Sequence, residues 1–153
     1  MTFQLIFAKY LAGVSLVFVA ILPTIVYLLS MYFLGAPVGN IDLGATLTSY
    51  IGLLLLGAAF VSIGMFASAL TQSQIVAFIL AMFMCWVFYD GFELLGNFSQ
   101  IGGLDYLIKY IGISFHYEAI KKGVIDSSDI LYFMSLNALF LFASLTVLKT
   151  LKK

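Results

Sequence analysis

The sequence is short of charged residues, and it contains no arginine. Only 9% of its 153 residues are charged, with seven lysines against seven acids, so the formal net charge is zero. A soluble domain is about 25% charged and needs those residues to cover its surface in water. This shortage excludes an ordinary soluble fold. It also argues against a nucleic-acid partner, because binding to phosphates needs a basic patch.

Groups that support catalysis or bind metals are scarce as well. The single cysteine, Cys85, cannot form an intrachain disulfide or a structural zinc site, and we interpret it as a small buried hydrophobic residue. The single histidine, His116, has no nucleophile and orienting group with which to complete a catalytic set. No Gly-x-x-x-x-Gly-Lys-Ser/Thr loop is present, so the chain cannot bind a nucleotide by that route. We therefore expect no enzymatic activity, no cofactor and no metal site.

Hydrophobic residues, by contrast, make up 63% of the chain and gather in four long stretches. Crossing about 30 Å of hydrocarbon takes about 20 apolar residues in a helix. The stretches cover residues 10–34, 47–70, 75–95 and 130–148. They predict an all-α integral membrane protein with four transmembrane helices in a single domain, residues 1–153. Pro23 predicts a kink in the first helix, because proline removes one helix hydrogen bond.

The segment between the third and fourth stretches, residues 96–129, is broken by glycines. Residues 104–111 and 115–122 mix aromatic, aliphatic and charged side chains, and each run is too short to span a membrane. They predict short amphipathic helices that lie at the membrane interface or dip back into the bundle. The polar run from Asp126 to Asp129 supplies N-cap oxygens for the fourth helix.

The distribution of lysines indicates the orientation of the chain. Four spans place both chain ends on one side of the membrane. Four lysines flank that side, Lys9, Lys149, Lys152 and Lys153, whereas the segment 96–129 contains three. Cytoplasmic loops carry the excess of positive residues in membrane proteins. The pattern favours cytoplasmic termini and an extracytoplasmic segment 96–129.

Small and polar residues within the spans are candidates for packing or transport. Gly57, Gly64, Ser68 and Thr71 share one face of the second span, which favours close helix packing; the alternative is that they line a translocation path. Asn137 lies near the middle of the fourth span, where its amide is expected to find a partner within the bundle. It is a second candidate for packing or for the path.

Asp90, Glu93 and His116 form a candidate outer entrance. The two acids lie three residues apart near the end of the third span, where a carboxylate costs less than at the bilayer centre. Exposure at the interface explains them, and a polar entrance or a partner contact is the alternative. The simplest interpretation of His116, beside Tyr117 and Glu118, is an interfacial aromatic cluster.

Several stretches carry a resemblance to a known family. They are Ser49–Leu53, Ala59–Thr71 and Gln74–Ile79, with Lys9–Gly13, Leu22–Thr24, Gly35–Asp42, Phe88–Glu93, Phe115–Tyr117 and Gly123–Asp126. Together they resemble the permease subunits of type-2 ABC exporters and, within them, the gliding-motility permeases of the GldF type. The resemblance implies a paired permease in a bacterial inner membrane, driven by a separate ATP-binding subunit. It also implies short re-entrant helices outside the membrane between the last two spans.

The chain matches the third to sixth of the six helices in such a permease. The first two helices and most of the cytoplasmic loop that contacts the ATPase have no counterpart, so we expect a chain truncated at its N-terminus. Two functions follow as hypotheses. The chain is a permease subunit or fragment of an exporter, paired with an identical or a different permease, or it is a non-transporting membrane scaffold of an envelope or motility complex. The residues do not specify a substrate, because an apolar bundle carries no readable polar pattern.

Overall fold

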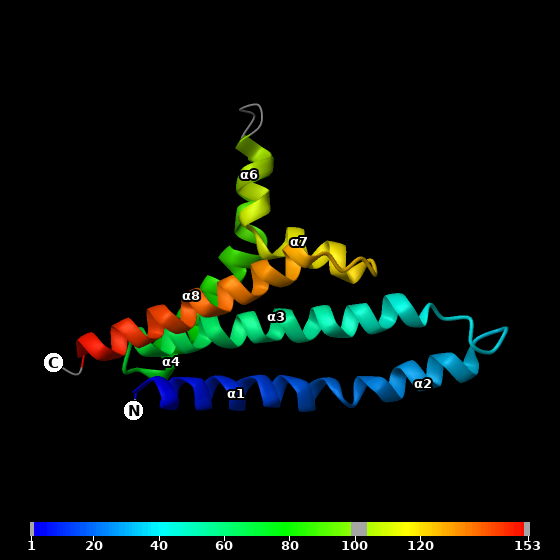
Figure 1. Cartoon of the computed structure of the whole chain (residues 1–153), viewed down its shortest axis with the longest axis horizontal. Helices are drawn as coiled ribbons and strands as arrows, with labels where there is room; N and C mark the ends of the chain where they lie inside the picture. The colour runs from blue at the N-terminus through cyan, green and yellow to red at the C-terminus, as the bar shows by residue number, and fades with distance from the viewer. Residues whose placement is uncertain (1, 99–103, 152–153) are drawn as a thin grey trace.

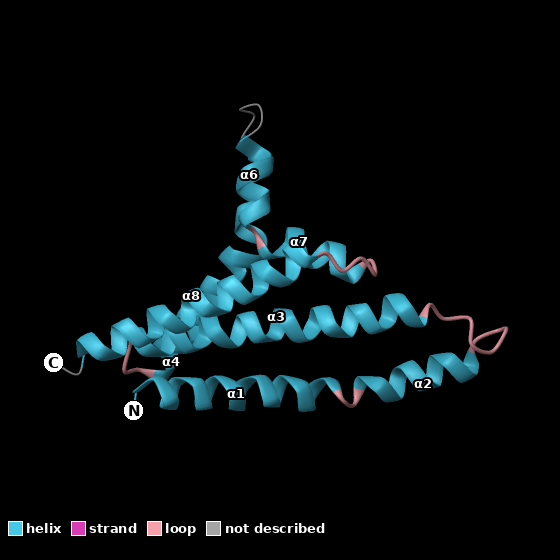
Figure 2. Ribbon diagram, in the orientation of Figure 1, coloured by secondary structure: helices cyan, strands magenta, loops and turns pink. Residues whose placement is uncertain are grey.

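The computed structural model describes residues 2–98 and 104–151, and within these ranges the chain is helical and has no strand (Figures 1 and 2). Four helical stretches are long and apolar enough to cross a membrane, which confirms the predicted fold class. They cover Phe3–Leu34, Leu43–Leu70, Gln74–Asn97 and Ser127–Leu151. The first begins at Phe3 rather than at residue 10, because Lys9 is a good helix former and does not interrupt the helix.

The first stretch consists of two helices, α1 (Thr2–Ile21) and α2 (Thr24–Leu34), with Leu22 and Pro23 between them. Pro23 has no N–H group to donate to the preceding turn, so the α-helical hydrogen-bond pattern is broken at the predicted position. The break is mild, because α2 continues in nearly the same direction as α1 (Figure 1).

Helix α3 (Leu43–Leu70) is the centre of the bundle and packs against α1, α4, α7 and α8. The Asp42 carboxylate caps its first turn by accepting the Ala45 N–H at 3.1 Å. Glycines let neighbouring helices approach α3 closely. A Cβ on Gly57 would lie 2.5 Å from Val17 of α1, and one on Gly52 would lie 2.6 Å from Ile120 of α7.

The third stretch changes direction before it ends. It consists of α4 (Gln74–Trp86), a π-helical turn η1 (Val87–Gly91) and α5 (Phe92–Phe98). A π-turn inserts an extra residue into the helix and interrupts its regular packing face. Helix α5 packs against α6 (Leu104–Ile111), and α6 stands almost perpendicular to the bundle (Figure 1). The sequence did not predict this turn.

Helices α7 (Ile113–Lys121) and α8 (Ser127–Leu151) complete the bundle and, with α6, match the predicted short helices and final span. The core lies where α3, α7 and α8 meet. Its buried members are Ala59, Ile63, Ile113, Ile120, Phe133, Leu136 and Phe140. The Phe140 ring contacts both Phe66 of α3 and Phe88 of η1, so it ties the third span to the core.

The two ends of the bundle differ in charge. At one end, the terminal end, α1 begins and α3 and α8 finish, so both chain ends lie on the same side (Figure 1). The part of the molecule toward the start of α3, here called the acidic end, includes α5 to α7, and α6 leaves the bundle beside the middle of α3 (Figure 1). All seven acids of the sequence lie toward the acidic end, at Asp42, Asp90, Glu93, Asp105, Glu118, Asp126 and Asp129.

Candidate functional site

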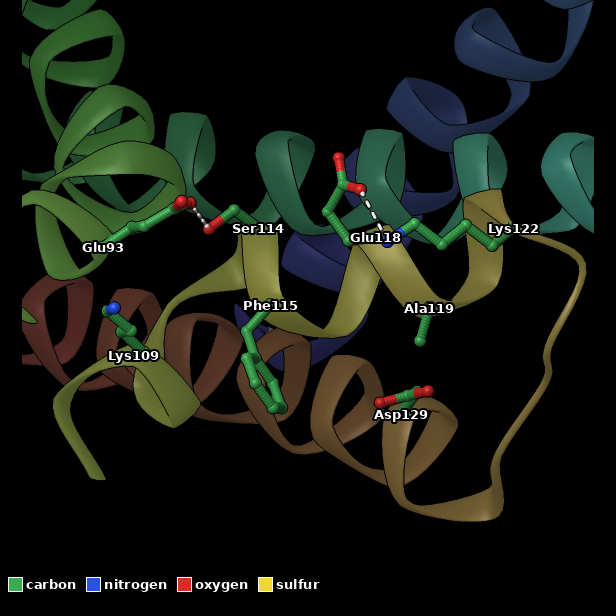
Figure 3. Close-up of a pocket in the computed structure, with 8 residues that line it drawn as sticks. All are labelled: Glu93, Lys109, Ser114, Phe115, Glu118, Ala119, Lys122 and Asp129. Atoms are coloured by element: carbon green, nitrogen blue, oxygen red, sulfur yellow. Dashed lines mark hydrogen bonds and ion pairs between the residues drawn. The ribbon is translucent and has the colours of Figure 1, made fainter. Parts of the chain in front are cut away.

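A pocket of about 400 Å³ opens at the acidic end, between α5, α6, α7 and the start of α8 (Figure 3). Carboxylates and ammonium groups line it together with one hydroxyl and one aromatic ring. Its lining residues are Glu93, Lys109, Ser114, Phe115, Glu118, Ala119, Lys122 and Asp129. Four helices supply these side chains, so the pocket exists only once the chain has folded.

A buried histidine–carboxylate pair lies beside the pocket. His116 Nδ1 is 2.6 Å from Asp129 Oδ1, and the two side chains are only 1% and 7% exposed. The other ring nitrogen, Nε2, lies 2.9 Å from the backbone carbonyl oxygen of Tyr110. Since a carbonyl oxygen can only accept, Nε2 is the donor in this hydrogen bond. The pair joins α7 to the first turn of α8.

Aromatic rings enclose the same histidine. The Tyr132 ring stacks on the imidazole with 4.0 Å between centroids and an angle of 19°. Tyr110 contacts the imidazole edge-on at 4.8 Å, and Phe115 does so at 5.5 Å. The Tyr132 hydroxyl donates to the backbone carbonyl of Ile111. The expected aromatic cluster around His116 is therefore present; the histidine itself is buried, whereas Tyr110 and Phe115 are partly exposed.

The remaining carboxylates of the pocket have weaker partners. Glu93 accepts a hydrogen bond of 2.9 Å from the Ser114 hydroxyl, which joins α5 to α7 (Figure 3). Glu118 pairs with Lys121 at 3.3 Å and with Lys122 at 3.6 Å, and all three side chains are well exposed. Exposed pairs of this kind contribute little to stability.

Lys109 is the one lysine of the pocket without a carboxylate within 4.0 Å in the described parts of the chain. Its aliphatic stem covers Gly96, where an added Cβ would lie 2.6 Å from Lys109 Cγ. The ammonium group and the neighbouring carboxylates place both signs of charge in one small cavity. Such a cavity suits a polar or zwitterionic molecule better than an apolar one.

Two of the three predicted entrance residues lie together. Asp90 and Glu93 line a smaller pocket of about 220 Å³ along η1 and α5, with Trp86, Leu94 and Asn97. Glu93 also lines the larger pocket, so it belongs to both. His116 does not line either pocket. No three His, Cys, Asp or Glu side chains gather as metal ligands in the part of the chain that the structure describes.

The predicted small-residue stripe on α3 divides into separate environments. Gly57 packs tightly against α1, as close helix packing requires. A Cβ on Gly64 would meet no heavy atom within 4 Å, and Ser68 is exposed beside Lys9. Thr71 lies just beyond the end of the helix. The stripe therefore serves packing at Gly57 and leaves Gly64 and Ser68 open.

Asn137 has one partner within its own helix. Its amide nitrogen donates to the Phe133 carbonyl at 2.8 Å, while its Oδ1 is buried and accepts no hydrogen bond. The expected bond to another helix is absent from the described residues. A buried acceptor without a partner costs about 1–3 kcal/mol.

Sequence reasoning missed the role of Asp129. We expected this residue to help cap the last helix, but the cap is supplied by Asp126, whose Oδ1 accepts from the Ser128 N–H at 3.3 Å. Asp129 is therefore free to turn toward His116. The sequence contained one signal for this role. Two acids, Asp126 and Asp129, lie near the start of one helix, and a single N-cap needs only one of them.

No protein-family model, curated protein or solved structure matches this chain. The function is therefore inferred from the residues, their geometry and the permease-like stretches.

Proposed function

We propose that the chain is a transmembrane permease subunit, or part of one, of an ABC-type exporter in a bacterial inner membrane. It works as one of a pair of permeases and is driven by a separate ATP-binding subunit. The observation that carries the proposal is the placement of the permease-like stretch from Ser49 to Ile79. This stretch forms most of the α3–α4 hairpin, and α3 is the helix that contacts α1, α4, α7 and α8.

Further support comes from the acidic end. The short helices α6 and α7 occupy the place where such a permease has re-entrant helices, and they bound the mixed-charge pocket. A pocket that holds both signs of charge beside an apolar bundle can serve as an entry or exit point for a polar substrate. Transport then requires the bundle to alternate between two arrangements, driven by ATP binding on the partner.

Co-purification tests the proposal. The tagged chain is isolated from native membranes in mild detergent, with a full-length six-helix permease of the same type as the positive control. We expect a nucleotide-binding ATPase to accompany both, with vanadate-sensitive ATP hydrolysis in the purified complex. An ATPase that accompanies the control but never this chain would contradict the proposal.

The alternative is a non-transporting membrane scaffold that holds other subunits of an envelope or motility complex. One observation favours it: α4 has no buried residue, so its face away from α3 is available to another chain. Substitution of large polar residues on α4 distinguishes the two functions. If the chain is a scaffold, the substitutions release its partner proteins, and neither parent nor variant shows ATP-dependent transport. If it is a permease subunit, they abolish transport in reconstituted vesicles.

A further inference from the structure

The terminal end of the bundle carries lysines, and none of its described residues is acidic. No acid occurs before Asp42 or after Asp129, and the whole of α4 is free of charge. Lys9 of α1 and Lys149 of α8 are the described charged residues there, and neither has an ion pair in the described ranges. Among the described residues of this end, no acidic side chain competes with an anionic ligand for Lys9 and Lys149.

A small crevice of about 130 Å³ lies at this end between α1, α3 and α8; its lining is mostly apolar, and its polar side chains are Lys9, Ser68 and Ser144. Lys9 and Ser68 are both exposed in it, and the Ser68 hydroxyl has no partner among the described residues. Ser144 lies at its buried side, with its hydroxyl already donated to the Phe140 carbonyl at 2.8 Å. The crevice thus offers an ammonium group and one free hydroxyl, which are both donors to a phosphate oxygen.

An apolar groove of about 410 Å³ lies next to the crevice, between α1 and α8. The two share the side chain of Ile6, which is only 3% exposed. All the other groove residues are also apolar: Phe3, Phe7, Ala138, Leu141, Phe142 and Leu145. An acyl chain is complementary to such a groove, because it leaves no polar group without a partner.

We propose that this crevice and groove together bind one anionic phospholipid. The phosphate lies against Lys9 and Ser68, and one acyl chain follows the groove between α1 and α8. The apolar groove favours a lipid over free phosphate. The absence of acids at this end favours an anionic lipid over a zwitterionic one, because no carboxylate can receive an ammonium headgroup. The site is independent of the transport function proposed above.

Native mass spectrometry of the purified full chain tests the lipid class. Phosphatidylglycerol and phosphatidylethanolamine with identical acyl chains are titrated separately. A lysine near an anionic lipid surface strengthens binding by roughly fivefold. We expect phosphatidylglycerol to be retained at least about fivefold more tightly. Equal retention of the two lipids would overturn the proposal.

Matched variants test the position of the headgroup. Lys9→Gln and Lys149→Gln remove the same charge from the same end, but only Lys9 lines the crevice. We expect Lys9→Gln to weaken phosphatidylglycerol binding roughly fivefold and Lys149→Gln to change it less than twofold. Equal losses in the two variants would mean general attraction to the surface and no defined site.

A second pair of variants tests the groove. Ala138→Phe fills the groove, whereas Leu139→Phe adds a ring elsewhere on the same helix, where the side chain is 60% exposed. We expect only Ala138→Phe to weaken lipid retention, with both variants unfolding at the same temperature as the parent. If Ala138→Phe has no effect, or if millimolar inorganic phosphate displaces the lipid, the site holds a simple anion and the proposal fails.

Discussion

Replacing Asp129 with alanine removes one partner of the buried pair with His116. The imidazole then keeps its bond to the Tyr110 carbonyl, but Nδ1 is left without a partner between α7 and α8. Breaking a buried pair in this way costs about 3–5 kcal/mol. The near-complete burial of both side chains places the expected loss within that range rather than near the small values of surface pairs.

Thermal unfolding in detergent, followed by circular dichroism, measures the loss. For a chain of this size, 1 kcal/mol lowers the midpoint by about 2–4 °C, so the expected shift is about 6–20 °C. Asp126→Ala is the matched control, because it removes a neighbouring exposed carboxylate that caps the same helix. Loss of a cap costs about 1 kcal/mol, which is a shift of only a few degrees.

The double variant His116→Phe with Asp129→Ala separates the pair from simple loss of packing. Phenylalanine keeps the stack on Tyr132 and leaves no buried nitrogen without a partner. Replacing both partners by apolar groups is close to neutral for such pairs. We expect the double variant to be more stable than Asp129→Ala alone. The reasoning is refuted if the loss of stability in the double variant equals the sum of the losses in His116→Phe and Asp129→Ala measured singly. It is also refuted if Asp129→Ala is no less stable than the Asp126→Ala control.

Three further predictions concern the spans and their packing. Gly57→Val should lower the free energy of unfolding by about 1–3 kcal/mol, because the new side chain meets α1. Gly64→Val, whose side chain meets open space, should lower it far less. Equal thermal unfolding midpoints for the two variants would contradict this. Asn137→Leu removes a buried oxygen without a partner, so it should stabilise the chain by about 1 kcal/mol and raise the unfolding midpoint; a lower midpoint would contradict this. In a cysteine-free background, Gln72→Cys and Val124→Cys lie in loops at opposite ends of the bundle, so a membrane-impermeant maleimide should label them from opposite sides.

The helices could largely be predicted from the sequence, whereas the candidate site could only be predicted in part. The break at Pro23 and the helix over 104–111 followed from local chemistry, which needs no knowledge of neighbours. Glu93, which we expected at an outer entrance, lines two pockets, and that role stays a prediction; Lys109 and Asp129 were not foreseen. Their roles depend on which helices become neighbours, and periodicity carries no information about that.

The sequence by itself determined the class of protein and the positions of its spans. Apolar stretches of this length and with this little charge must be helical in a membrane, because lipid offers the backbone no hydrogen-bond partner. Only the tertiary structure decided which polar groups meet. The α7–α8 contact brings His116 to Asp129, and the convergence of α5, α6 and α7 makes the mixed-charge pocket. Those contacts join residues distant along the chain, so their formation depends on the packing of whole helices.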